Sequence, residues 1–186
     1  MISAKPVKIS SNLIRFFSTN KEKILIVFHS RSGNTKKIAQ EIQNKFKKEF
    51  ETDLEEIKTE KRYSKLGIIF AAGKDAMTKK LTNIAPPQKD VSQYSTVVVG
   101  TPIWAWTITP AVRTYLESQK KKFKKTAFFC TFGSSGDQGT FQEMKKILNL
   151  DPISTLPITR KELRNKSYEQ KMEKFIEKIK LNLEKK

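Results

Sequence analysis

Small hydroxyl-bearing residues gather in one short segment of the chain, HSRSGNT at residues 29–35. Ser30, Ser32 and Thr35 supply side-chain hydroxyls, and Gly33 lets the backbone approach a ligand closely. The segment follows an apolar run and precedes an amphipathic one, so we expect it to join a strand to the start of a helix. Backbone N–H groups at such a junction bind anions, and the helix N-terminus adds a favourable dipole. The segment therefore predicts a phosphate site.

This segment differs from two common nucleotide-binding motifs. It matches neither G-x4-G-K-[ST] nor G-x-G-x-x-G, and residues 30–35 contain no lysine. Neutral donors suit a terminal monophosphate better than a triphosphate with magnesium. The alternative interpretation is that Ser32 or Asn34 only caps the following helix.

Two further segments place aromatic, glycine and hydroxyl residues directly after apolar runs. TPIWAWT at residues 101–107 holds both tryptophans of the chain, and TFGSSGD at residues 131–137 is rich in glycine and serine. Indoles can pack on a flat ligand, although they can equally hold the loop against the core. Because ligands bind at the carboxyl ends of parallel strands, all three segments are expected at one edge of a sheet.

The strands that would position these segments are predicted from apolar runs. Residues 24–28, 97–100 and 127–130 are continuously apolar, as expected of parallel strands covered on both faces. Residues 52–58 are more polar and predict a strand at the sheet edge, and residues 153–158 predict the last strand.

Helices are expected between these strands. Residues 35–50 and 62–80 show helical spacing of apolar side chains, and Thr109 followed by Pro110 is typical of a helix start. Capping boxes are predicted at two further helix starts, Thr140–Glu143 and Ser167–Gln170. Five repeats of strand and helix predict a doubly wound α/β domain, with a parallel sheet and helices on both faces.

The three segments, in this order, resemble the flavin-binding loops of the flavodoxin-like family, and the resemblance extends over roughly residues 23–183. HSRSGNT resembles the phosphate loop of that family, VVVGTPIWAW its second flavin loop and FFCTFGSSG its third. The resemblance implies a five-stranded sheet of order 2-1-3-4-5 that holds flavin mononucleotide (FMN) non-covalently.

The resemblance also implies the residues of the cofactor site. The phosphate would be bound by Ser30, Arg31, Ser32, Gly33, Asn34 and Thr35. The isoalloxazine would contact Thr101, Pro102, Ile103, Trp104 and Ala105, with Trp106 covering it. The remaining edge would be lined by Thr131, Phe132, Gly133, Ser134 and Gly136. His29 is expected to pack at a strand end rather than donate protons, and Cys130 is expected to be structural.

Three functions are compatible with this interpretation. The first is electron transfer through bound FMN to a redox partner protein, which needs no catalytic acid or base. The second is an FMN-dependent NAD(P)H reductase that acts on a quinone or similar acceptor. The third is a basic binding module that uses the same fold without flavin.

The net charge of +18, from 37 basic and 19 acidic residues, departs from the acidic surface typical of electron-carrying flavodoxins. It suggests a partner with an acidic surface, although solvated helix faces of a lysine-rich protein are the alternative. The lysine cluster (Lys120, Lys121, Lys122, Lys124 and Lys125) encloses a single aromatic residue, which argues against specific nucleic-acid binding.

Composition excludes several other classes. One cysteine permits no intramolecular disulfide, and one histidine besides argues against a His/Cys metal site. No apolar run reaches the roughly 18 residues of a membrane span. Residues 1–22 form a basic extension before a single domain at residues 23–186. We expect a cytoplasmic protein with a short disordered extension; the alternative is a transit peptide for a mitochondrion or related organelle, whose composition residues 1–20 resemble.

Overall fold

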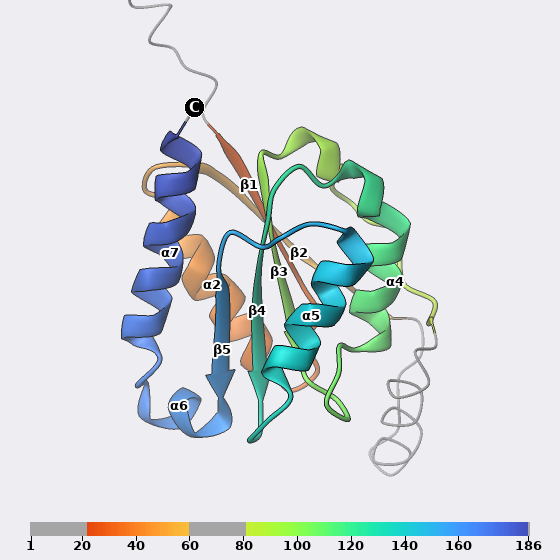
Figure 1. Cartoon of the computed structure of the whole chain (residues 1–186), viewed down its shortest axis with the longest axis vertical. Coiled ribbons are helices and arrows are strands. Elements are labelled where there is room, and N and C mark those ends of the chain that lie inside the picture. Colours follow the sequence, from red (N-terminus) through yellow and green to blue (C-terminus); the bar gives the residue numbers. More distant parts are fainter. Residues whose placement is uncertain (1–21, 60–80, 186) are drawn as a thin grey trace, which may run out of the picture.

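Five parallel strands form the centre of the molecule (Figure 1). The computed structural model describes residues 22–59 and 81–185. The strands lie in the order β2-β1-β3-β4-β5, which confirms the predicted fold class and strand order. Their bounds are Lys23–Phe28 (β1), Glu51–Glu56 (β2), Thr96–Pro102 (β3), Thr126–Phe132 (β4) and Thr155–Thr159 (β5). The helix predicted over residues 62–80 lies outside the described residues, as does the extension predicted over residues 1–22 apart from its last residue.

Helices cover both faces of the sheet, as Figure 1 shows. Helices α2 (Asn34–Phe46) and α7 (Glu169–Glu184) pack on one face, and α4 (Pro110–Gln119) and α5 (Asp137–Leu148) on the other. Alternate residues of β1 pack into the hydrophobic cores on the two faces of the sheet, because successive side chains of a strand point to opposite faces. Ile24 and Ile26 join the core under α2 and α7, while Leu25 joins the core under α4 and α5.

The polar strand predicted at the sheet edge is β2, and its carboxylates have partners inside the molecule. The Asp53 carboxylate accepts a hydrogen bond from the Tyr94 hydroxyl at 2.6 Å. Glu55, which is 8% exposed, accepts bonds from the backbone N–H groups of Gln88 (2.8 Å) and Lys89 (3.2 Å). The acidic residues of β2 therefore hold the chain that leads into β3.

The start of α4 is confirmed. The Thr109 hydroxyl accepts a hydrogen bond from the Val112 N–H, and Pro110 occupies the first helical position, where its missing N–H has no consequence.

The two capping boxes predicted for later helices are wrong. Helix α5 begins three residues before Thr140, after Gly136, whose φ of 104° is left-handed. Helix α7 begins at Glu169 without a side-chain cap. The capping box lies instead at Thr159 and Glu162, and it opens the short helix α6 (Arg160–Asn165).

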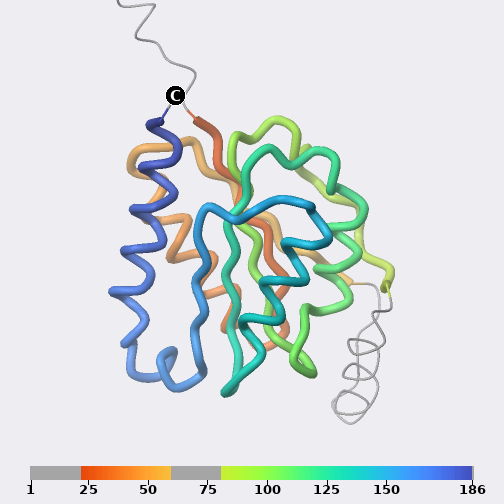
Figure 2. The backbone as a smooth tube through the Cα atoms, viewed as in Figure 1, coloured from red at the N-terminus to blue at the C-terminus, as the bar shows by residue number. Residues whose placement is uncertain are grey.

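The two ends of the sheet differ in character. The lysine cluster lies at the amino end, in the 3-10 helix η3 (Lys120–Lys122) and the residues just before β4. Figure 2 places the start of β1 and the end of α7 at this same end. The segments that follow β1, β3 and β4 lie at the opposite, carboxyl end. No helix within the described ranges combines the length and apolar character that a membrane crossing requires.

Candidate functional site

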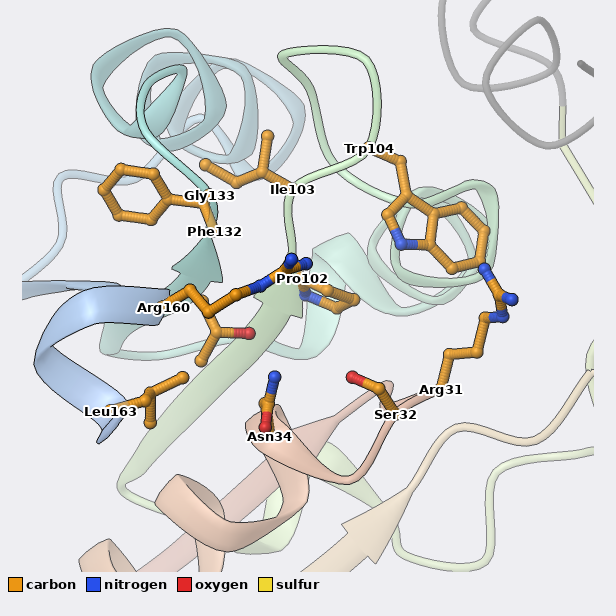
Figure 3. A pocket seen from close by; sticks show the side chains of 11 residues that line it. Arg31, Ser32, Asn34, Pro102, Ile103, Trp104, Phe132, Gly133, Arg160 and Leu163 are labelled. Carbon is orange, nitrogen blue, oxygen red and sulfur yellow. The ribbon is translucent and has the colours of Figure 1, made fainter. Parts of the chain in front are cut away.

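The three predicted segments meet at the carboxyl end of the sheet around a cavity of about 480 Å³ (Figure 3). Helix α6 closes a further side of it. The cavity is lined by Arg31, Ser32, Asn34, Pro102, Ile103, Trp104, Thr131, Phe132, Gly133, Arg160 and Leu163. Side chains from the ends of four strands therefore converge on one space, although they are far apart in the sequence.

The first segment leads into α2 with its helix N-terminus open. Gly33 occupies the N-cap position with a φ of 86°, and no side chain caps the helix, so neither Ser32 nor Asn34 plays the capping role that was the alternative. The first turn also contains no acidic residue. The N–H groups at this end of α2 and the positive end of its dipole are thus available to an anion.

Hydroxyl and amide groups surround that helix start. The side chains of Ser32 and Asn34 line the cavity. The Ser30 Oγ is buried and has no hydrogen-bond partner among the described residues. A buried hydroxyl without a partner is unfavourable, so a ligand oxygen that reached Ser30 would satisfy it, although Ser30 is not among the lining residues.

Thr35 serves a different purpose from its neighbours. Its Oγ1 lies 2.8 Å from the Thr131 Oγ1, and both residues are buried. Thr131 lines the cavity, whereas Thr35 does not. This pair of hydroxyls joins the start of α2 to the end of β4, and so fixes the first segment relative to the third.

The second segment makes a tight two-residue turn. Trp104 and Thr107 exchange backbone hydrogen bonds of 3.0 and 3.1 Å, and Ala105 and Trp106 between them have left-handed φ values of 46° and 62°. Two positive φ values are the pattern of a type I′ turn, which ordinarily favours glycine and asparagine. The turn separates the tryptophans: Trp104 lines the cavity, whereas Trp106 is 69% exposed and lies outside it.

Side chains behind this turn hold it in place. The Thr107 hydroxyl donates to the Glu143 carboxylate and accepts from Arg113 Nη2 at 3.3 Å. Upstream, the Thr101 hydroxyl donates to the Pro102 carbonyl at 2.9 Å and accepts from the Thr109 N–H at 3.4 Å. Thr101 is fully buried, and its side chain supports the fold rather than lining the cavity.

The third segment begins within a strand. Thr131 and Phe132 are the last residues of β4, and Gly133 follows on the cavity wall. Ser134 is exposed and does not line the cavity. A Cβ at Gly136 would lie 3.0 Å from the Trp106 Cα. Gly136 therefore allows the second and third segments to pack together, which is a packing role.

His29 and Cys130 have the packing environments that the sequence predicted. The His29 ring is 8% exposed, its Nδ1 lies 2.9 Å from the Ile57 carbonyl oxygen, and its edge meets the Trp104 ring at 5.8 Å between centroids. A carbonyl only accepts, so Nδ1 carries the proton of the neutral ring. Burial lowers the pKa of His29, and burial raises the pKa of the Cys130 thiol. Neither side chain lines the cavity.

Sequence reasoning missed two lining residues, Arg160 and Leu163, both on α6. Their position follows from the last strand, because Thr159 pairs in register with Phe132. A signal was present in the sequence. Thr159 and Glu162 form the S/T-x-x-E pattern of a capping box directly after an apolar strand.

The lining divides into an apolar wall and a polar end. Pro102, Ile103, Trp104 and Phe132 offer apolar surface, whereas Ser32, Asn34 and the two arginines offer donors. Among the described residues that line it, none is a carboxylate, histidine or cysteine. The cavity therefore suits a ligand with a flat apolar part and an anionic tail, and it provides binding rather than acid–base groups.

Comparisons with known proteins agree with this architecture. A family model described as flavodoxin matches residues 23–179. No protein with a curated description matches the sequence significantly.

Among similar solved structures, a flavoprotein from Lactobacillus acidophilus in complex with FMN is 20% identical, with a TM-score of 0.62, and the match covers 80% of this chain and 99% of that one. A putative flavoprotein from Bacteroides eggerthii is 22% identical, with a TM-score of 0.61 and coverage of 78% and 95%. The rubredoxin oxygen:oxidoreductase of Desulfovibrio gigas is 16% identical, with a TM-score of 0.53, and the match covers 91% of this chain and 39% of that one. These likenesses concern the fold.

Proposed function

The chain belongs to the flavodoxin family, and on that premise we propose that it holds FMN non-covalently in the cavity at the carboxyl end of the sheet and transfers electrons through it. The observation that carries the proposal is the convergence of the three segments on one cavity with an apolar wall and an anion-binding end. A similar fold binds FMN in the Lactobacillus acidophilus flavoprotein.

The residues of the chain divide the binding between the two parts of the cofactor. The open N-terminus of α2, with the lining residues Ser32 and Asn34 and the buried hydroxyl of Ser30, would hold the phosphate. Trp104 and Ile103 would pack against the isoalloxazine from one side, and Phe132 and Gly133 would line its edge. Thr35 and Thr101 would support cofactor binding indirectly, because their buried hydroxyls hold the backbone of the first and second segments in place.

When bound, FMN supplies one- and two-electron transfer. The contribution of the chain is to orient the ring, to exclude water with the apolar wall and to leave part of the rim open to a partner. Because none of the described lining residues is an acid–base group, we propose electron transfer to a redox partner ahead of NAD(P)H-dependent reduction of a small acceptor. Arg31, an exposed residue of the lining, favours a partner whose docking surface is acidic.

FMN titration of the apoprotein tests this proposal. The wild-type protein should bind FMN with saturation and become yellow. Ser32→Ala should weaken binding roughly tenfold or more, since a hydrogen bond to a charged group contributes about 1.5–3 kcal/mol. Ser95→Ala is the matched control, because its hydroxyl bonds to the Lys23 carbonyl at the other end of the sheet. Failure of the wild-type protein to bind FMN would overturn the proposal.

A second measurement separates carrier from reductase. Anaerobic mixing of the FMN-loaded protein with NADPH or NADH should leave the flavin spectrum unchanged until a reductase is added. Bleaching by the nucleotide alone would identify the protein as an NAD(P)H reductase.

A further inference from the structure

Arg160 reaches the proposed phosphate site from an element outside the three flavin segments. It is the first residue of α6 and follows β5 directly. Figure 3 shows its side chain extending from the start of α6 into the cavity, with Asn34 and Ser32 on the α2 side. Both of those residues line the same cavity.

The start of α6 is firmly positioned, so Arg160 is not on a loose loop. The Thr159 N–H donates to the Glu162 carboxylate at 2.8 Å, and the Glu162 N–H donates to the Thr159 hydroxyl at 3.2 Å. Leu163, at 9% exposure, packs in the core shared by α2 and α7. The capping contacts fix the start of α6, and Leu163 anchors this helix in the core that α2 also enters.

Within residues 22–59 and 81–185, no carboxylate forms an ion pair with the guanidinium of Arg160. The one acidic residue of α6, Glu162, pairs with Lys171 at 2.6 Å. No carboxylate lines the cavity. Arg160 is thus a cation that projects into a cavity with donors on the facing wall and no acceptor carboxylate.

The open N-terminus of α2 and the Arg160 guanidinium therefore face the same space from different elements, in a lining that also contains Arg31. Each favours negative charge, and arginine matches the oxygens of a phosphate with two parallel N–H bonds. An uncharged ligand tail at this point would leave both without a counter-charge.

We propose that Arg160 binds the terminal phosphate of the cofactor and determines the preference of this protein for the phosphorylated over the unphosphorylated flavin. The inference rests on the proposed function. Ionic recognition would supplement the neutral hydroxyl donors of residues 30–35, and it would make cofactor affinity sensitive to salt.

Titrations of the apoprotein with FMN and with riboflavin test this assignment. Arg160→Gln should weaken FMN binding by about 10- to 100-fold, because a charge-assisted bond is lost, and should change riboflavin binding by less than about twofold. Arg164→Gln is the matched control: it removes the same charge from an exposed position on α6 that does not line the cavity. It should leave both affinities unchanged. Arg160→Lys, which keeps the charge but not the fork of donors, should lie between the wild type and Arg160→Gln.

Other outcomes overturn the inference. If Arg160→Gln lost equal affinity for FMN and for riboflavin, Arg160 would lie against the ring rather than the phosphate. If Arg160→Gln bound FMN as tightly as the wild type, Arg160 would not contact the cofactor. If riboflavin binds too weakly to measure, the salt dependence of FMN affinity decides, because Arg160→Gln should show a shallower dependence than Arg164→Gln and an equal one would refute the assignment. Wild-type protein that binds no FMN would instead refute the proposed function itself.

Discussion

The Nη2 of Arg113 lies 2.7 Å from the Oε1 of Glu143, and this ion pair joins helix α4 to helix α5 behind the two-residue turn between Trp104 and Thr107. The two side chains are 4% and 17% exposed. Both also contact the hydroxyl of Thr107, the last residue of the turn. The position of Trp104 on the cavity wall therefore depends on a network behind the cavity.

Glu143→Gln should lower the free energy of unfolding by about 3 kcal/mol, because it removes the carboxylate that neutralises a buried guanidinium. Urea denaturation measures this. Glu117→Gln is the control, since Glu117 pairs with Lys120 at 3.0 Å on the surface and such pairs contribute about 0–1 kcal/mol. Equal losses in the two variants would contradict the structural importance of the buried pair.

Acid should weaken the fold through His29. Burial holds the pKa of His29 below the ordinary value of 6.5. The stability that depends on the neutral ring is therefore fully present above pH 6.5 and is lost as the pH falls through the folded-state pKa. His29→Asn places an amide N–H near the position of Nδ1 but does not titrate. Urea unfolding at about pH 7.5 and about pH 5.5 should show a larger loss for the wild type than for the variant. Equal losses of unfolding free energy in the two proteins would show that groups other than His29 determine the loss of stability in acid.

Gly136→Ala should destabilise the protein more than Gly33→Ala. Both glycines have left-handed φ values, so each substitution costs about 1–2 kcal/mol of backbone strain. Only at Gly136 does the added Cβ also meet backbone, the Trp106 Cα at 3.0 Å; around Gly33 it meets nothing within 4 Å. Thermal unfolding of the two variants compares them, and a similar melting temperature for both would show that the second and third segments separate easily.

FMN should quench the fluorescence of Trp104 and not that of Trp106. Trp104 lines the cavity, and Trp106 is 69% exposed outside it. Trp106→Phe should therefore keep the quenching on FMN addition, and Trp104→Phe should lose most of it. The reverse pattern would mean that Trp106 closes over the flavin, as the family resemblance implied.

The strands of the sheet and the positions of the three segments could be predicted because their signals are local, whereas the strand order was implied by the family resemblance. Continuous apolar runs identify buried parallel strands, and Thr109 with Pro110 identifies the start of α4 from adjacent residues. The binding roles of the predicted site residues remain predictions that the titrations test.

The remaining features depend on tertiary contacts. Thr140 and Glu143 have the spacing of a capping box, yet Glu143 pairs with Arg113 and Thr140 lies in the helix interior. The left-handed turn at Ala105 and Trp106 contains neither glycine nor asparagine, the residues from which such a turn is ordinarily predicted. Arg160 was missed because it follows the fifth strand and reaches the cavity only through the fold.

The lysine cluster sits at the amino end of the sheet, a strand length away from the cavity. A polyanion such as a cation-exchange resin or an acidic filament that binds the lysine cluster would therefore contact the amino end of the sheet. The opening of the cavity, at the carboxyl end, would then face bulk solution. Small ligands could still enter the cavity in that orientation. A redox protein bound to the same lysines would instead lie at the amino end of the sheet, far from the cavity.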